Sequence, residues 1–497
     1  MGTHVGSSLP SSTPAAQGVD ARGVHAFLDA LEAAPGIDPH SVMLLRNGHL
    51  VAEGWWAPHT ADRPQLLYSL SKSFTSVAAG SAAAEGLIDL DAPVVSYFPE
   101  FEAEITDQRS RSMLVRHIAS MASGHESETW DRAVPADRAE PVRGFLSLPP
   151  EREPGTVFAY NQSCTYTLGA IVQRVTGQSL TAYLRKRLFD PLGITETVWE
   201  QFPAGRDLGF SGMHATTDAV ARLGQLHLQG GVWEGRRLLP AEWVAEATRS
   251  HVSNHDGTAE GAADSDWQQG YGFQFWMSRH GFRGDGAYGQ YCVILPEYDA
   301  VLALTSQTQD MQEVLDAVWR HLLPAFGDAP LPGREADDAS LRSRLSRLLL
   351  PPVAGRAAPL AGAGPWAGAR FVPEGGTCAH QPTLTEVTLR HRDGTGSSGD
   401  DGGAGWVLDL AEGGQRFGLG FGSDGWTTTE GGPGTPPCAV SAGWTDQDTL
   451  TATVRFLETP HSLDLRCVLR TGTFTAEWRT RPLHPRPLLH RMCAPRP

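Results

Sequence analysis

One stretch near the start of this chain constrains it more than any other: residues 68 to 76, which read YSLSKSFTS. After Ser69, apolar residues recur at helical spacing and small residues follow until Gly86. This pattern predicts a buried helix whose first turn begins at Ser69. Residues three apart share a helix face, so Ser69 and Lys72 should lie side by side. Ser69 should also meet unpaired backbone N–H groups and the positive end of the helix dipole.

Lysine is scarce in this chain, which makes its position informative. Of the 40 basic residues only Lys72 and Lys186 are lysines, and the rest are arginines. A desolvated lysine can lose its proton and act as a base, whereas an arginine cannot. A serine followed three residues later by a lysine therefore indicates an activated nucleophile. Lys186 lies between two arginines and is interpreted as part of a solvated helix face.

Charge and composition exclude several classes of function. The net charge of −16 and a pI near 5.5 argue against nucleic acid or an anionic membrane surface as a partner. No apolar run reaches the roughly 20 residues of a membrane span. The six cysteines show neither C-x-x-C pairs nor zinc spacing, so we expect reduced core residues of a cytoplasmic protein. No metal or cofactor motif is present, and no signal for an oligomeric state is found.

The first two thirds of the chain predict a mixed α and β domain over residues 19–327, after a disordered lead-in over 1–18. A strand on each side of Asn47-Gly48 predicts a β-hairpin. Helical and loop-like signals fill residues 86–265, and strand-like runs follow at 272–276, 291–295 and 300–304. A last helix is expected after Asp310, with Glu313 completing a capping box. This order favours an antiparallel sheet flanked by helices, with an inserted all-α lobe.

The remaining residues have a different character. Residues 328–365 are rich in Pro, Gly, Ala and Arg, and we interpret them as a linker. Apolar and polar residues then alternate, most clearly over 463–469 and 474–478. This period of two, with Gly/Asp/Ser clusters between the runs, predicts a small all-β sandwich or barrel over residues 366–497. The sequence shows no catalytic cluster in this part.

A serine–lysine pair also needs a proton relay and donors for a developing oxyanion. Tyr160 follows a Pro-Gly turn, in the run Tyr160-Asn161-Gln162. Gly284-Asp285-Gly286 lies at a strand, and its glycines allow the backbone to approach a ligand closely.

In this order, the three motifs resemble those of the class C β-lactamase and penicillin-binding-protein-like family of serine hydrolases. That family includes esterases, D-aminopeptidases and 6-aminohexanoate-dimer hydrolases. The resemblance covers roughly residues 20–327 and includes phrases such as EGLIDLDAP at 85–93 and FDPLG at 189–193. It implies the family's fold and its serine nucleophile, while the substrate stays open because the fold hosts many hydrolases.

By position, the resemblance implies that Ser69 is the nucleophile, Lys72 its base and Tyr160 the proton relay. Gln162 stands at the Asn position of the family's Tyr-x-Asn motif. Gly284-Asp285-Gly286 stands at the Lys-Thr-Gly or His-x-Gly motif, and its first residue carries no cation. The backbone N–H groups of Ser69 and Ala287 would form the oxyanion hole.

Further residues are candidates for contact with substrate. Besides Gln162, Asp285 and Gly286, they are the residues after the Ser123-Gly124 turn and the aromatic and amide residues around the third motif: His125, Glu126, Trp130, Tyr271, Trp276, Tyr288 and Gln290.

We therefore expect a serine hydrolase that cleaves a small ester, amide or peptide through a Ser69 acyl-enzyme. The alternatives are an acyltransferase or peptide-cyclising enzyme using the same acyl-enzyme, a β-lactamase, and a non-catalytic binding or sensor module. The missing cation at Gly284 disfavours the β-lactamase, and the intact Ser69, Lys72 and Tyr160 set disfavours the binding module.

Overall fold

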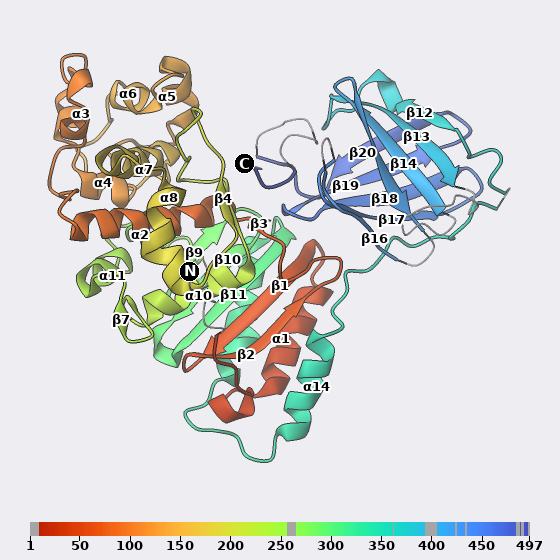
Figure 1. The fold of residues 1–497 in the computed structure, drawn as a ribbon, viewed down its shortest axis with the longest axis horizontal. Helices are drawn as coiled ribbons and strands as arrows, with labels where there is room; N and C mark the ends of the chain where they lie inside the picture. The colour runs from red at the N-terminus through yellow and green to blue at the C-terminus, as the bar shows by residue number, and fades with distance from the viewer. Residues whose placement is uncertain are drawn as a thin grey trace, which may run out of the picture.

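The computed structural model describes residues 9–255, 265–360, 362–392, 405–422, 425–432, 435–483, 488 and 492–495. Figure 1 shows a sheet with helices on it, a helical lobe above, and a separate β domain beside them. Within the described residues, none of the helices combines the length and apolar character needed to cross a bilayer.

The central sheet has six strands, and its order joins the two ends of the N-terminal domain. That order is β2-β1-β11-β10-β9-β8, and all of its pairs are antiparallel. The strands are β1 (Ile37–Arg46), β2 (His49–Trp55), β8 (Trp276–Met277), β9 (Phe282–Gly286), β10 (Gln290–Leu295) and β11 (Ala300–Thr308). The hairpin predicted at Asn47-Gly48 is confirmed. The strand predicted over 272–276 is wrong except for its last residue, because Gln274 takes a left-handed φ of 68°.

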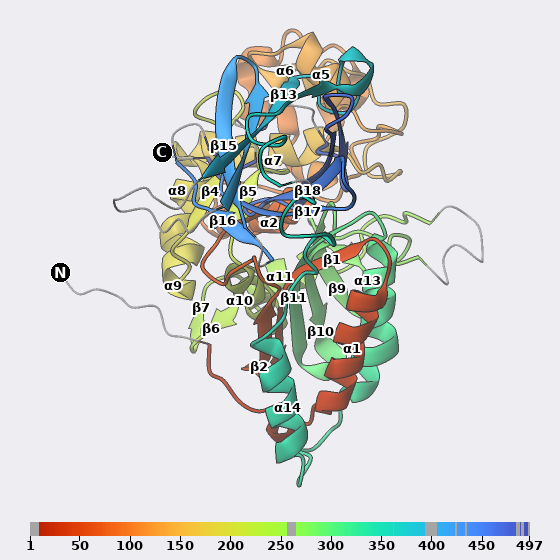
Figure 2. The ribbon, with the colours of Figure 1, turned by 90° about the vertical axis from the view of Figure 1, so that its right-hand side faces the viewer.

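Helices cover both faces of this sheet. On one face, α1 (Ala21–Ala33), α13 (Met311–Ala317) and α14 (Glu335–Leu345) form one apolar cluster with the strands. Figure 2 shows α1 and α14 side by side. On the other face, α2 (Ser71–Ala84) and α10 (Thr217–Leu228) pack into the larger core. The β9 backbone lies against the start of α2, and this contact positions the site.

The predicted all-α lobe is confirmed. In the chain it lies after strands β1 and β2 and before strands β8 to β11 of the central sheet. Its long helix is α7 (Gln162–Thr176), which packs on α2. The shorter helices are α3 (Gln108–Ser112), α4 (Val115–Ala119), α5 (Trp130–Ala136), α6 (Pro141–Leu146), α8 (Leu180–Leu184), α9 (Asp190–Leu192) and α11 (Ala241–Ala247). A small sheet of β3 (Gln65–Leu66), β5 (Met213–Ala215) and β4 (Thr197–Trp199) lies beside the start of α2, and β6 (Val232–Trp233) pairs with β7 (Arg236–Arg237).

The C-terminal domain is a near-barrel made of one nine-stranded sheet around its own apolar core. The sheet order is β15-β14-β13-β12-β20-β19-β18-β17-β16. Among the described strands of this sheet, β12 and β20 form the only parallel pair. The strands are β12 (Arg370–Pro373), β13 (Leu384–Arg392), β14 (Gly405–Glu412), β15 (Gln415–Phe421), β16 (Thr427–Thr429), β17 (Cys438–Trp444), β18 (Thr449–Phe456), β19 (His461–Val468) and β20 (Thr473–Trp478).

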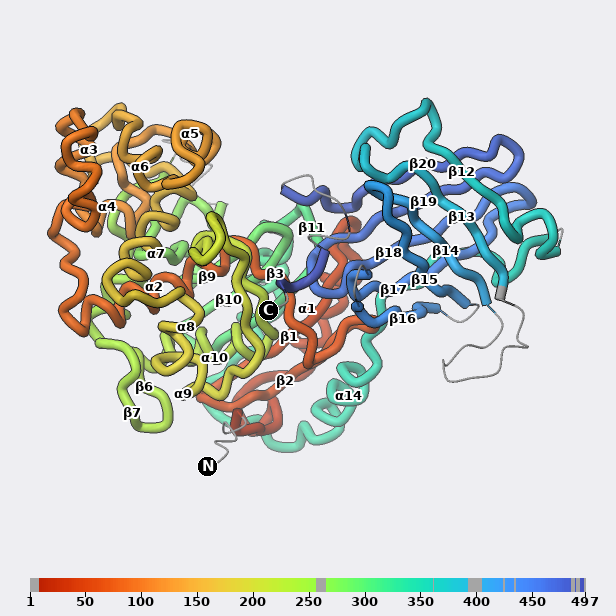
Figure 3. Tube along the Cα trace, turned by 45° about the horizontal axis from the view of Figure 1, so that its top comes forward, coloured from red at the N-terminus to blue at the C-terminus, as the bar shows by residue number. Residues whose placement is uncertain are grey.

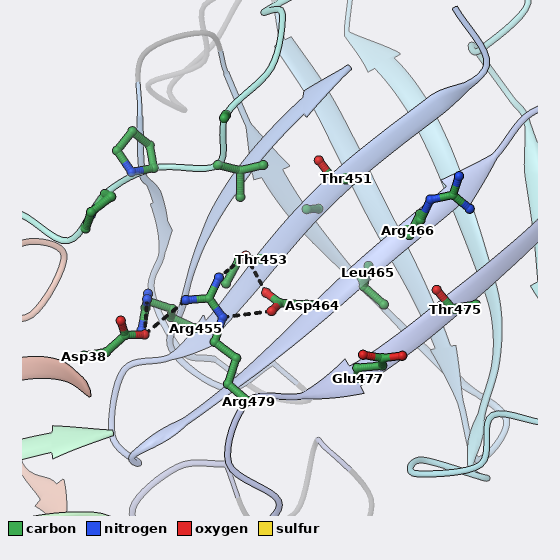
Figure 4. A pocket seen from close by; sticks show the side chains of 15 residues that line it. Asp38, Thr451, Thr453, Arg455, Asp464, Leu465, Arg466, Thr475, Glu477 and Arg479 are labelled. Carbon is green, nitrogen blue, oxygen red and sulfur yellow. Dashed lines mark hydrogen bonds and ion pairs between the residues drawn. The ribbon is translucent and has the colours of Figure 1, made fainter. Parts of the chain in front are cut away.

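Polar contacts join the two domains. Asp38 on β1 accepts hydrogen bonds from Arg455 at 2.6 Å and from Arg479 at 3.1 Å, beside a cavity of about 610 Å³ (Figure 4). Gln307 on β11 contacts Arg455 at 3.2 Å and Thr480 at 3.0 Å. Residues 479–483, which follow β20, lie on the side of the domain that faces β3 (Figure 3). The Leu66 N–H of β3 donates to the Glu458 carbonyl.

Three expectations need correction. Residues 9–18, expected to be disordered, are described and packed: Leu9 is buried and Ser12 N–H donates to the Leu50 carbonyl. Residues 328–365, expected to be a linker, contain α14, whose Leu341 and Leu345 join the core beneath the sheet. The Asp310–Glu313 capping box is not formed, since the Asp310 side chain caps no N–H.

Candidate active site

Ser69 lies in a 3-10 turn, Tyr68–Leu70, which continues directly into α2. The α-helix thus begins two residues later than the sequence predicted. Tyr68 has a left-handed φ of 48°, which is unusual for an aromatic residue, and strain of this kind gathers at functional sites. Ser69 is partly exposed, whereas Tyr68 and Leu70 are buried. Ser69 is therefore the most exposed residue of this turn.

The Lys72 amine lies within hydrogen-bond distance of three oxygens. Its Nζ is 3.0 Å from Ser69 Oγ, 2.6 Å from Gln162 Oε1 and 2.8 Å from the Phe210 carbonyl oxygen. The side chain is only 1% exposed. The ring centroid of Tyr160 is 4.8 Å from Nζ.

Burial lowers the pKa of Lys72 from 10.5 to about 7, although Glu128 and Asp285 act in the opposite direction. A neutral amine has two N–H donors and one lone pair. The Gln162 and Phe210 oxygens only accept hydrogen bonds, so they take both N–H groups. The lone pair is then left for the Ser69 hydroxyl proton, which is the arrangement a general base requires.

Tyr160 lies above Lys72 and interacts with Ser69. Burial raises the pKa of its hydroxyl well above the usual value, and a hydrogen bond with the Ser69 side chain partly offsets this. The ring stacks on Trp276, with centroids 5.1 Å apart. Tyr160 is therefore held as a neutral phenol, which can accept one proton while donating another.

Asn161 and Glu128 fix the start of α7 and thereby Gln162. The Asn161 side chain caps this helix, accepting from Ser163 N–H at 3.0 Å and from Thr129 Oγ1 at 2.9 Å. The Glu128 carboxylate accepts from Gln162 N–H at 2.9 Å. Gln162 thus presents its side-chain oxygen to Lys72 from a well-anchored backbone.

The two glycines of the third motif let β9 lie directly against the Ser69 turn. A Cβ at Gly284 would be 2.6 Å from Ser73 Oγ, and one at Gly286 would be 2.0 Å from the Leu67 carbonyl oxygen. Neither space accommodates a side chain. Ala287 follows Gly286 and packs with Tyr68, which brings its backbone close to the Ser69 turn.

The charge of the third motif is neutralised internally. Arg283 is fully buried and donates from Nε to Asp285 Oδ2 at 2.9 Å. Its Nη1 donates to Asp266 and Met277 carbonyls and to Ser278. Burial raises the pKa of Asp285, although Arg283 lowers it. Arg283 therefore balances Asp285 and presents no free cation beside Ser69.

The structure brings some of the other sequence candidates to the site but not all of them. Trp276 contacts Tyr160, as described. His125 is fully buried and uses both ring nitrogens, toward Ser123 Oγ and the Leu148 carbonyl, each at 3.0 Å. The Tyr288 hydroxyl donates to the Arg481 carbonyl of the C-terminal domain. His125 and Tyr288 thus have structural partners in place of substrate.

Other candidates lie around the site or support it. Glu126 is exposed and pairs with Arg152. Gln290 donates to the Ser306 carbonyl at 2.8 Å. The Tyr271 ring packs edge-on against Tyr160. Trp130 packs on Phe210, with ring centroids 4.8 Å apart.

Sequence reasoning missed contacts made across long separations. The Phe210 carbonyl meets Lys72 from 138 residues away, and no side-chain pattern signals a carbonyl. His461 Nε2 lies 2.5 Å from the Tyr68 hydroxyl, although 393 residues separate them. The one available signal was the alternation of apolar and polar residues in β19. Extended two residues toward the start of the strand, it places His461 on the same buried face as Leu463. Within the described residues, no cluster of three or more His, Cys, Asp or Glu could hold a metal ion.

Comparison with known proteins shows which family the chain belongs to. The Beta-lactamase family matches residues 24–325. The chain is 29% identical over 288 residues to the 6-aminohexanoate-dimer hydrolase of Paenarthrobacter ureafaciens, covering 54% of this chain and 72% of that protein. It is 27% identical over 213 residues to Esterase EstB of Burkholderia gladioli, covering 37% of this chain and 54% of that protein.

The fold has a solved counterpart from Bacillus anthracis, a candidate 6-aminohexanoate-dimer hydrolase. The two structures agree with a TM-score of 0.51 at 21% sequence identity, over 64% of this chain and 87% of that one. Because the family match spans more than half of the chain and the relatives are named hydrolases and esterases, this protein is an enzyme that belongs to the beta-lactamase family of serine hydrolases.

Proposed function

We propose that the protein hydrolyses a small ester or amide through an acyl-enzyme on Ser69. The observation that carries this proposal is the environment of Lys72, whose amine is 3.0 Å from Ser69 Oγ and whose pKa is lowered to about 7 by burial. A base with a pKa near the working pH is the most effective.

In the proposed reaction, neutral Lys72 takes the proton from Ser69 as Oγ attacks the substrate carbonyl. The backbone N–H groups of Ser69 and Ala287 stabilise the negative charge on the tetrahedral oxygen. Tyr160 passes the proton to the leaving oxygen or nitrogen. Water then attacks the acyl-enzyme with the same groups in reverse order and releases the acid.

A neutral substrate fits this site better than a β-lactam does. A penicillin or cephalosporin carries a carboxylate, and Arg283, the basic residue next to the third motif, is buried against Asp285. A substrate carboxylate would therefore lie near Asp285 without a free partner, which is costly. The named relatives, an amide hydrolase and an esterase, support the ester or amide assignment.

The test compares kcat/KM for p-nitrophenyl butyrate and nitrocefin on one preparation, with Ser69→Ala as the control. We expect the ester to be the better substrate by at least about 100-fold, and Ser69→Ala to abolish its turnover. A higher kcat/KM for nitrocefin would favour the β-lactamase alternative, and ester turnover that survives Ser69→Ala would refute the proposal.

A further inference from the structure

A second cavity adjoins the Ser69 turn and is lined in part by the C-terminal domain. It has a volume of about 340 Å³, within the range of small-molecule sites. Tyr68, which precedes Ser69, lines it, as does Phe210, whose carbonyl accepts from Lys72. The C-terminal domain contributes His461, Pro482 and Met492. The cavity thus shares Tyr68 and Phe210 with the surroundings of Ser69 and Lys72, which are not themselves among its lining residues.

The walls of this cavity combine a group of aromatic and aliphatic side chains with a comparable share of polar surface. Trp130, Phe202 and Phe210 form a cluster of rings, with Trp130 centroids 6.2 Å from Phe202 and 4.8 Å from Phe210. Val134 and Met492 add aliphatic surface. The part of the wall that these side chains form binds apolar groups by removing them from water.

The charged residues of the cavity disfavour an anionic occupant. Asp131 and Glu200 carry negative charge, and Arg138 carries the one positive charge among the lining residues of the described chain. The Arg138 guanidinium already lies over the Phe202 ring, 5.1 Å from its centroid.

The wall from the C-terminal domain is held firmly. His461 Nδ1 lies 2.9 Å from the Thr480 carbonyl and must donate to it, so Nε2 accepts the Tyr68 hydroxyl proton at 2.5 Å. Burial lowers the pKa of His461 to about 3, so the ring stays neutral. The Tyr288 hydroxyl donates to Arg481, the residue before Pro482. The wall is thus bonded to the same turn that carries Ser69.

We infer that the C-terminal β domain completes the active site, and that this cavity receives an uncharged aromatic or branched apolar group of the ester or amide. This inference rests on the proposed function, because it places the occupant as part of the substrate that Ser69 attacks. It assigns the domain a role in substrate selection, with Pro482 as a specificity-determining position.

Binding to the Ser69→Ala protein tests the cavity without turnover. The probes are ethyl acetate, ethyl 3-phenylpropanoate and 2-phenylethyl acetate, the last two placing a ring on the acyl or the alcohol side. We expect at least one ring-bearing ester to bind at least about tenfold more tightly than ethyl acetate. Adding Pro482→Trp, which fills the cavity from the C-terminal domain, should remove this preference.

The matched control is Val372→Trp, which adds the same side chain at an exposed position of β12 away from the cavity. It should keep the preference. Pro482→Leu, a smaller addition, serves if the tryptophan variant does not fold. Equal affinity for the three esters, or a preference that survives filling at Pro482, would overturn the inference. Failure of the proposed function shows separately, as absence of Ser69-dependent turnover in the unaltered protein.

Discussion

Replacing Lys72 by methionine should stabilise the protein near neutral pH. The pKa of Lys72 falls from 10.5 to about 7 on folding, a difference of about 3.5. Each pKa unit corresponds to about 1.4 kcal/mol. Burial of Lys72 therefore costs about 5 kcal/mol of folding free energy at pH 7 and below. Because the side chain is only 1% exposed, solvent screening does not reduce this figure.

Methionine has similar length and no charge, but it loses the contacts of Nζ with Ser69, Gln162 and Phe210. Each hydrogen bond contributes about 1 kcal/mol, so about 3 kcal/mol is lost. The net gain for Lys72→Met should be about 2 kcal/mol near pH 7.

The pH dependence of this gain is the sharper result. Between pH 7 and 10.5 the unfolded chain holds a proton on Lys72 that the folded chain has lost. The stability of the unaltered protein therefore rises with pH in this window, by up to about 1.4 kcal/mol per pH unit. The advantage of Lys72→Met should disappear by about pH 9.

Urea unfolding of both proteins at pH 6, 7, 8 and 9 measures this, with Lys186→Met as the control for loss of an exposed lysine. A difference in unfolding free energy that stays constant with pH would show that Lys72 remains charged in the folded protein. It would refute the role of Lys72 as the base.

Other predictions address activity and stability. Lys72→Arg should lower kcat by at least about 1,000-fold with the fold retained by circular dichroism, because arginine cannot act as the base, whereas Lys186→Arg should keep activity; near-normal turnover by Lys72→Arg would contradict this. Asp285→Asn leaves the Arg283 guanidinium buried without its carboxylate, and should destabilise the protein by about 3–5 kcal/mol in urea unfolding; an unchanged midpoint would contradict the buried pair. Burial lowers the pKa values of His214 and His227 to about 4. Between about pH 6.5 and 4 the unfolded chain therefore binds protons that the folded chain does not. As the pH is lowered through this window, the free energy of unfolding should fall by up to about 3 kcal/mol per pH unit for the two groups together. Thermal denaturation at pH 7 and 5 checks this, and equal midpoints would contradict it.

Local patterns predicted the elements but not how distant ones meet. The hairpin at Asn47-Gly48 and the alternating strands of the C-terminal domain depend on turn chemistry and side-chain period, which are local. The helix after Ser69 was predicted two residues early, because a 3-10 turn has no distinct side-chain pattern. The linker interpretation of 328–365 gave too little weight to the helical spacing of Leu341 and Leu345, which the core uses.

The candidate site was likewise predictable only where its residues are close together in the sequence. The spacing of Ser69 and Lys72 indicated their proximity, since three residues make one turn. The Phe210 carbonyl and His461 reach the site only through the tertiary fold, and a backbone oxygen carries no sequence signal. Arg283 was seen next to the third motif, but its pairing with Asp285 depends on burial that the sequence does not display.

Identification of the serine that a covalent nucleophile probe modifies tests the central claim most directly. The protein is incubated with a fluorophosphonate, digested and mapped by mass spectrometry, with Ser69→Ala in parallel. We predict one adduct, on Ser69, and none on the variant. Ser71 and Ser73 are buried, and their hydroxyls already bond to Met213 N–H and to the Gln274 carbonyl. An adduct on Ser71 or Ser73, or no adduct on the unaltered protein, would contradict the account.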